Sequence, residues 1–333
     1  MLKINVLNQA LKVLRKNERY IMSKSIMKKI DQHTHMDKSK LVLNPPFPDA
    51  IKIEITGRCN YNCSFCAQKS SLRKIGDIDR NFLYRILWEA KSIGVKEIGM
   101  FLLGESFLVK ELAEYVKYAK EVVGIEYVFI TTNGSMATSD RMIPLIEAGL
   151  DSIKFSINAG TRETYKNLHC CDRFDEVVSN VKWLHKYKEE NNIDSLRTCI
   201  SSIFILSEKV NLRAFEKEMN NYVDDFYFLP LYNQAGHIGG KEYTKIVGNP
   251  GRYENMVEPI PCWALFNAAK ITWNGWLTAC CFDHDEKFEI ADLNKVSLTE
   301  AWNNPKFIGM RQEHLDNKFG KDSLCAKCLD IKT

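Results

Sequence analysis

Three cysteines, Cys59, Cys63 and Cys66, lie on one short segment at spacings that suit an iron–sulfur cluster. The segment follows a predicted strand, and the carboxyl ends of parallel strands face the crevice in which α/β proteins bind their substrates. Three thiolates on one loop can surround a cluster and leave one position open for a group that is not protein. A zinc ion would need a fourth ligand, and no other Cys or His lies between Cys66 and residue 93, the predicted end of the next helix.

A second group of cysteines lies in the C-terminal part of the chain: Cys262, Cys280, Cys325 and Cys328. Asn274-Gly275 separates two alternating segments, 268–273 and 276–280, and this dipeptide is a strong signal for a tight β-hairpin. The hairpin would bring the cysteines at its two ends together, and the Cys-x2-Cys pair would complete a site of four thiolates. Zinc and an iron–sulfur cluster both suit such a site.

The remaining cysteines have no partner pattern, and we expect isolated thiols at Cys170, Cys171, Cys199 and Cys281. The total of 11 cysteines is odd, which does not suit a framework of disulfides. A reducing compartment also keeps thiols free. Metal or redox chemistry is therefore the leading explanation for the cysteine content.

Alternating strands and helices must position the first three cysteines. Strand patterns occur at 50–56, 96–102, 126–131, 152–157, 198–205 and 225–230, and helical patterns at 79–93, 108–122, 139–148, 173–190 and 208–220. This alternation predicts an α/β fold with a parallel sheet and right-handed crossovers. No glycine-rich dinucleotide fingerprint follows the first strand. Periodicity alone leaves open whether the sheet curls into a partial barrel or stays flat.

Changes in composition divide the chain into three parts. The segment Asn44-Pro45-Pro46-Phe47-Pro48 ends any helix and marks a boundary. We therefore expect a basic helical N-terminal extension at 1–48, an α/β core at 49–235, and a small appendage at 236–333 that contains the hairpin and a helical pattern at 298–316.

Net charge and hydropathy limit the kinds of partner and the cellular location that the sequence predicts. Residues 1–40 contain ten Lys and Arg against three Asp and Glu, so the net charge of +4 comes from the extension. We expect this segment to form a helix packed on the body, and the alternative is an arm that binds a partner. No nucleic-acid motif accompanies the segment, so nucleic acid is not an expected partner. His33 and His35 are expected at the surface. No apolar run approaches the ~18 residues of a membrane span, and no secretory signal precedes the body, so we expect a cytoplasmic location without a membrane span.

The first cysteine group resembles the radical S-adenosylmethionine (SAM) superfamily, because Phe65 precedes the third cysteine and the loop follows the first strand. The resemblance implies a partial (βα)6 barrel in which the three thiolates hold a [4Fe–4S] cluster whose open iron chelates SAM. It also implies that SAM is cleaved reductively to a 5′-deoxyadenosyl radical, which abstracts a hydrogen atom from a substrate. An electron donor such as flavodoxin or ferredoxin would be a partner.

Shorter motifs extend the resemblance in the same order along the chain. It implies SAM contacts from Phe65, Gly104, Glu105, Asn133, Ser156 and Asn158, each near the end of a predicted strand or in the cysteine loop. Leu103 and Ser106 depart from the usual glycine and proline of the second motif. Many relatives have an arginine near His169, and we expect this histidine to be a loop residue without a role.

The second cysteine group resembles the SPASM/twitch appendage of radical SAM enzymes. Gly275-x4-Cys280, the run at 297–302, Arg311 and Cys325-x2-Cys328 carry this resemblance. Four cysteines are too few for the two clusters of a full SPASM domain, so the resemblance is to twitch enzymes of the 2-deoxy-scyllo-inosamine dehydrogenase type with one auxiliary [4Fe–4S] cluster. A structural zinc knuckle is the alternative.

A cluster with four cysteine ligands has no iron open to a substrate and suits electron transfer. The expected reaction is therefore a two-electron oxidation, such as alcohol to ketone, on a sugar, cyclitol or nucleotide-linked polyol. The alternatives are a maturase that oxidises or crosslinks a peptide, and a non-catalytic iron–sulfur or zinc protein. The sequence does not identify a catalytic base; the candidates by position are Tyr227, Tyr232, His169, Asp283 and Asp285.

Overall fold

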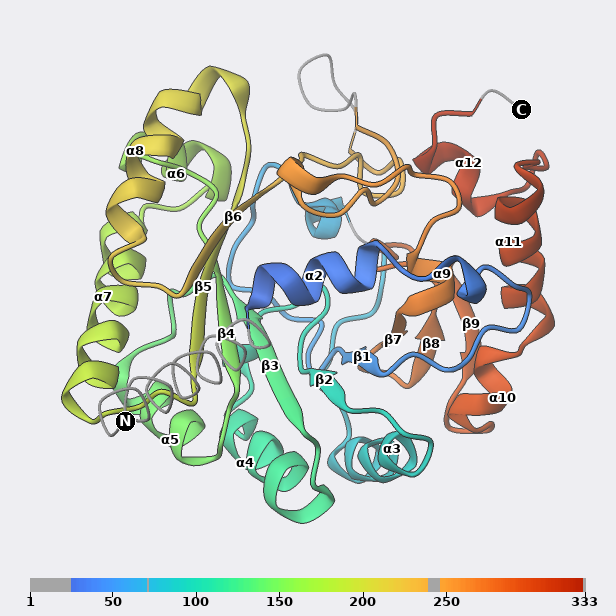
Figure 1. Ribbon diagram of the computed structural model, residues 1–333, viewed down its shortest axis with the longest axis horizontal. Coiled ribbons are helices and arrows are strands. Elements are labelled where there is room, and N and C mark those ends of the chain that lie inside the picture. Colours follow the sequence, from blue (N-terminus) through green and yellow to red (C-terminus); the bar gives the residue numbers. More distant parts are fainter. Residues whose placement is uncertain (1–24, 71, 239–245, 332–333) are drawn as a thin grey trace, which may run out of the picture.

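The computed structural model describes residues 25–70, 72–238 and 246–331. Six parallel strands form the core: β1 (Ala50–Ile53), β2 (Glu97–Gly99), β3 (Tyr127–Thr132), β4 (Ser152–Ser156), β5 (Arg197–Ile203) and β6 (Asp225–Leu229). They lie side by side in the order of the sequence (Figure 1). Strand β6 is an edge and does not pair with β1, so the sheet is an open, partial barrel. The predicted α/β class and partial barrel are confirmed.

Amphipathic helices cover the outer face of this sheet (Figure 1). They are α3 (Arg80–Ser92), α4 (Leu112–Lys117) with a π-helical continuation (Tyr118–Val123), α5 (Ser139–Glu147), α6 (Arg162–His169), α7 (Phe174–Glu190) and α8 (Lys209–Met219). In α3, Asp79 caps the first turn through the Phe82 amide, and Leu83, Ile86 and Leu87 are completely buried. Helix α6 was not predicted because it is only eight residues long.

The C-terminal appendage extends the same sheet. Its elements are α9 (Ala264–Asn267), β7 (Ala269–Ile271), β8 (Trp276–Thr278), β9 (Glu289–Asp292), α10 (Leu298–Trp302), α11 (Pro305–Asp316) and α12 (Leu324–Cys328). Strand β7 pairs in parallel with β1 and forms the predicted hairpin with β8. The helical pattern at 298–316 is two helices, because Asn304 caps a new helix in which Pro305 takes the first turn. The sheet is continuous across the predicted boundary at residues 235 and 236.

Short 3-10 turns occur at Lys38–Lys40, Ala67–Ser70, Ser106–Leu108, Leu206–Glu208 and Tyr253–Asn255. No helix in the described part of the chain is long and apolar enough to span a membrane.

Helix α2 (Ile26–Thr34) crosses the inner, concave side of the sheet near the starts of the strands (Figure 1). Asp225, the first residue of β6, accepts hydrogen bonds from the Ser25 hydroxyl at 3.1 Å and the Ile26 amide at 2.7 Å. Lys29 forms an ion pair with Glu97 at the start of β2. The described end of the basic extension is thus a helix packed on the body; residues 1–24 lie outside the described residues.

Candidate active site

The loop that carries Cys59, Cys63 and Cys66 follows β1 at the carboxyl edge of the sheet. The Ser64 amide donates to the Leu168 carbonyl at 2.8 Å, and the Tyr61 and Tyr165 hydroxyls lie 3.0 Å apart, so helix α6 anchors the loop. All three thiols are partly exposed. Burial raises the pKa of each thiol, that of Cys59 to about 11, so ligand binding must displace their protons.

Gly104 lets the loop after β2 approach this first loop closely. A Cβ atom at Gly104 would lie 2.1 Å from the Thr56 carbonyl oxygen, a distance that no side chain tolerates. The next residue is almost fully buried, and the Glu105 carboxylate accepts hydrogen bonds from the Thr132 hydroxyl at 2.8 Å and from the Asn133 amide at 2.7 Å. Glu105 therefore holds the turn after β3, and a contact with an ammonium group of SAM stays a prediction.

The turn after β3 also connects to the cysteine loop. The Asn133 side chain donates to the Asn60 side chain at 2.8 Å, next to Cys59. Ser156 is the last residue of β4 and is partly exposed. The Asn158 side chain accepts from the Ile203 amide at 3.0 Å and joins β4 to β5. The predicted SAM contacts thus lie along one edge of the sheet; that they touch SAM stays a prediction.

His169 differs from the expectation of a loop residue without a role. It ends helix α6, is buried, and stacks on Tyr165 with ring centroids 4.1 Å apart. Its Nε2 accepts a hydrogen bond from the Asn158 amide at 3.3 Å, so the proton of the neutral ring is on Nδ1. Nδ1 lies 3.3 Å from the sulfur of Cys63 and donates to it. Phe65 packs edge-on against the same ring, at 5.3 Å between centroids.

The four C-terminal cysteines line one small cavity of about 40 Å³: Cys262, Cys280, Cys325 and Cys328. Cys281 and His314 line the same cavity. His314 accepts a hydrogen bond from the Cys262 amide at Nδ1, which leaves the proton on Nε2, and this buried nitrogen has no partner among the described residues. No three His, Cys, Asp or Glu side chains in the described ranges are placed to hold a single metal ion.

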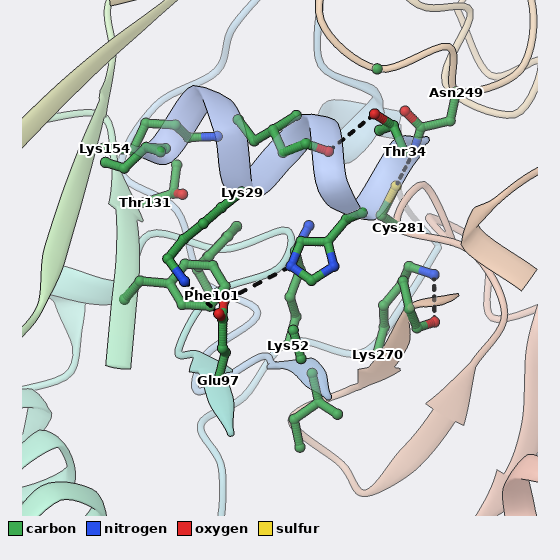
Figure 2. A pocket seen from close by; sticks show the side chains of 18 of the residues that line it. Lys29, Thr34, Lys52, Glu97, Phe101, Thr131, Lys154, Asn249, Lys270 and Cys281 are labelled. Atoms are coloured by element: carbon green, nitrogen blue, oxygen red, sulfur yellow. Dashed lines mark hydrogen bonds and ion pairs between the residues drawn. The ribbon is translucent and has the colours of Figure 1, made fainter. Parts of the chain in front are cut away.

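A larger cavity of about 290 Å³ lies inside the partial barrel (Figure 2). Helix α2 closes it on one side, and its walls include the inward-facing side chains of β1, β3, β4 and β6. Lys52 from β1 and Lys154 from β4 extend into it, and Lys270 from β7 lies on the side of the appendage (Figure 2). Asn249, Cys281 and Phe282 line both cavities, so the two cavities share a wall.

The five candidate bases lie in different places. Tyr227 and Tyr232 line the larger cavity, and burial raises the pKa of both phenols, so both are neutral. Asp283 is bound to the Thr278 hydroxyl in the hairpin region, and Asp285 pairs with Lys287. His169 contacts Cys63 instead. The structure brings only the two tyrosines to the cavity.

Sequence reasoning missed the roles of two strand lysines, of His33 and of Gln234. Lys52 and Lys154 stand inside predicted parallel strands, where a lysine is uncommon, and this was the available signal. His33, expected at the surface, lines the larger cavity. Gln234 links the two cysteine regions, because its side chain bonds to the Phe65 carbonyl at 2.8 Å and the His284 ring at 3.1 Å.

Comparison with known proteins adds two family matches. The model of the radical SAM superfamily matches residues 53–206, and that of an iron–sulfur cluster-binding domain, SPASM, matches residues 262–329. A probable GTP 3′,8-cyclase of Saccharolobus solfataricus is 30% identical over 283 residues, which cover 75% of this chain and 88% of the relative. The chain belongs to the radical SAM superfamily.

Three other relatives of this radical SAM enzyme align over less of their length. An uncharacterized protein of Methanocaldococcus jannaschii is 30% identical over 200 residues, 60% of this chain and 61% of the relative. The match to a further GTP 3′,8-cyclase covers 38% of that protein, and the match to a further probable GTP 3′,8-cyclase covers 43% of it. The chain thus spans less than two-thirds of these three curated relatives.

Solved structures share the fold. BtrN in complex with AdoMet and 2-DOIA superposes with a TM-score of 0.58 at 22% identity, over 84% of this chain and 92% of BtrN. SuiB of Streptococcus suis bound to its precursor peptide SuiA gives a TM-score of 0.62 at 16% identity, over 95% of this chain and 74% of SuiB. Both similarities concern the fold alone.

The cofactors of this superfamily fit the residues present. SAM and its [4Fe–4S] cluster belong to the radical SAM domain, and auxiliary iron–sulfur ligation belongs to the SPASM domain. The Nε2–H of His314 lines the four-cysteine cavity without a partner, and a sulfur atom of a bound cluster would accept its hydrogen bond. Cys59, Cys63 and Cys66 are the proposed ligands of the SAM-binding cluster, and the other four cysteines are those of the auxiliary cluster.

Replacing Gly104 with alanine should weaken SAM binding at least tenfold and lower the free energy of unfolding by about 2 kcal/mol, because the new Cβ displaces the loop from the Thr56 carbonyl. Gly309→Ala is the control, since nothing lies within 4 Å of a Cβ there. Equilibrium SAM binding and denaturant unfolding are the measurements. A Gly104→Ala protein that binds SAM like the wild type would contradict the assignment of this loop.

Replacing His169 with phenylalanine should lower the reduction potential of the SAM-binding cluster by roughly 40 mV, the equivalent of one hydrogen bond of about 1 kcal/mol. The Nδ1–H donor to Cys63 stabilises the more negative, reduced cluster, and phenylalanine keeps the ring but lacks the donor. EPR-monitored redox titration measures the potential, with His185→Phe as the control. An unchanged potential in His169→Phe would refute the hydrogen bond.

Proposed function

We propose that this radical SAM enzyme is a cytoplasmic oxidoreductase that removes two electrons from a small polyol, sugar or nucleotide-linked sugar. When bound, SAM and its cluster supply a 5′-deoxyadenosyl radical that takes a hydrogen atom from the substrate, and the auxiliary cluster supplies an acceptor for the second electron. A flavodoxin or ferredoxin is the proposed electron donor.

The observation that carries this proposal is the shared wall between the two cavities. A substrate in the larger cavity would lie against a wall that contains Asn249, Cys281 and Phe282, which also line the four-cysteine cavity. This proximity supports a direct transfer of an electron from a substrate radical. The four thiols would complete the ligand set of an auxiliary cluster, so such a cluster suits electron transfer better than substrate ligation.

The larger cavity supports a small substrate. Its volume of about 290 Å³ is at the lower end of the range for small-molecule sites. Helix α2 closes one side and is fixed by Asp225, and by an ion pair of Asp31 with Arg252 at 3.0 Å.

A second candidate is a cyclisation of a nucleotide, supported by the relatives named GTP 3′,8-cyclase. The lysines of the cavity would suit a nucleotide phosphate as well as a sugar phosphate. Modification of a peptide, the reaction class suggested by the fold similarity to SuiB, has less support because the cavity is small and closed by α2.

Anaerobic incubation of the reconstituted protein with SAM and dithionite tests the proposal. We expect 5′-deoxyadenosine, and more of it when phosphorylated sugars or cyclitols are added. Absence of 5′-deoxyadenosine with every candidate substrate would refute the radical mechanism. Stimulation by guanine nucleotides alone would favour the cyclase.

A further inference from the structure

Two lysines extend into the larger cavity from different strands of the sheet. Lys52 lies in β1 and Lys154 in β4, and both side chains reach the space under helix α2 (Figure 2). The ring of Phe101 lies near both ammonium groups, 5.4 Å from the Lys52 nitrogen and 5.8 Å from the Lys154 nitrogen. The two positive charges therefore face one region of the cavity.

The other two lysines of the cavity are already bound. Lys29 pairs with Glu97, and the Lys270 ammonium donates to three backbone carbonyls at 3.1 to 3.2 Å. In the described part of the chain, Lys52 and Lys154 have neither a hydrogen-bond acceptor nor a carboxylate. The acidic groups that face them are thiols, Cys281 toward Lys52 and Cys199 toward Lys154.

Both lysine side chains are partly buried, so their charges are costly without a ligand. Desolvation lowers the pKa of Lys52, and desolvation together with the neighbouring Lys52 charge lowers the pKa of Lys154 to about 8. With a pKa of about 8, Lys154 is still mostly protonated at pH 7. A bound anion would offset the repulsion between the two ammonium groups and the cost of burying them.

We propose that Lys52 and Lys154 bind a phosphate group of the substrate, an inference that rests on the proposed function for the identity of the cavity. Two separate lysines act as compact point charges, the mode in which lysine commonly binds phosphate, and together they suit a dianionic phosphate. The substrate class is thus a phosphorylated small molecule.

The position of the lysines gives the substrate an orientation. Lys154 and Ser156 lie on the same face of β4, about 7 Å apart along the strand. Ser156 is at the carboxyl edge, where the predicted SAM contacts lie. The phosphate would therefore bind deep in the partial barrel, and the carbon skeleton would extend toward the edge where hydrogen abstraction takes place.

Calorimetric titration of inorganic phosphate into the anaerobic holoenzyme, with SAM present at pH 7, tests the inference. Lys52→Met and Lys154→Met should each weaken phosphate binding at least tenfold. Lys217→Met, on the exposed side of α8, should bind phosphate like the wild type. Thermal unfolding is the second readout: phosphate should raise the melting temperature of the wild type and of Lys217→Met but not that of Lys154→Met.

Three outcomes would overturn the inference. The wild-type protein could bind no phosphate, or the Lys52→Met and Lys154→Met variants could bind phosphate as tightly as the wild type. In the third outcome, the wild type binds succinate as tightly as phosphate. Because binding needs no turnover, the inference and the proposed function fail separately. Phosphate binding that needs both lysines, in an enzyme that makes no oxidised product, would support the phosphate site and refute the oxidation.

Discussion

Replacing Cys63 with alanine should abolish the cleavage of SAM. Cys63 is the middle thiol of the first loop and the one that accepts the hydrogen bond from His169. Two remaining thiolates cannot hold a cluster whose fourth position must stay open for SAM. The iron content should fall by about four atoms per chain, and 5′-deoxyadenosine should fall to the level of a reaction without enzyme. Iron analysis and chromatography are the measurements.

Cys170→Ala provides the matched control for this change. Cys170 is an exposed cysteine at the end of α6, next to His169, and no cluster is proposed for it. It should keep the full iron content and the full rate of SAM cleavage. If Cys63→Ala still cleaves SAM, or if Cys170→Ala also loses the cluster, the assignment of the three ligands is wrong.

Replacing Cys325 with serine should separate SAM cleavage from substrate oxidation. Cys325 is the first cysteine of the Cys-x2-Cys pair on α12, and its side chain lines the four-cysteine cavity. It is far along the chain from the first cysteine loop. Loss of this thiolate should remove the auxiliary cluster and leave the SAM-binding cluster in place. We expect about four iron atoms per chain in place of about eight, continued formation of 5′-deoxyadenosine, and no oxidised product.

Cys281→Ser is the informative comparison, because Cys281 lines the same cavity but is not among the four proposed ligands. It should keep the iron content of the wild type. Full turnover by Cys325→Ser would refute the role of the auxiliary cluster as electron acceptor, and loss of iron in Cys281→Ser would make Cys281 a ligand in place of one of the four.

The sheet and the two cysteine groups could be predicted because their signals are local. Alternating apolar segments mark parallel strands, and Asn274-Gly275 marks the hairpin that the structure contains. The approach of Cys262 to Cys280 was predicted from the same turn. The helical pattern after residue 298 concealed a break, because Asn304-Pro305 restarts the helix without interrupting the pattern.

The residues that sequence reasoning missed, or whose role it misjudged, depend on long-range packing. His169 gains its contact with Cys63 because α6 packs against the cysteine loop, and an eight-residue helix carries a weak sequence signal. Lys52 and Lys154 are 102 positions apart and meet only because β1 and β4 line the same curved interior. Curvature of the sheet cannot be derived from strand periodicity, so the composition of the cavity could not be predicted.

Mass spectrometry of a reaction with a small-molecule extract tests the central claim most directly. The holoenzyme, SAM and a reductant are incubated with the extract, and metabolites that change only in the presence of SAM are compared by mass. The account predicts a phosphorylated compound that becomes lighter by two hydrogen atoms, with one 5′-deoxyadenosine formed per product. A product of unchanged mass, as in a cyclisation, or a change confined to peptides would contradict it.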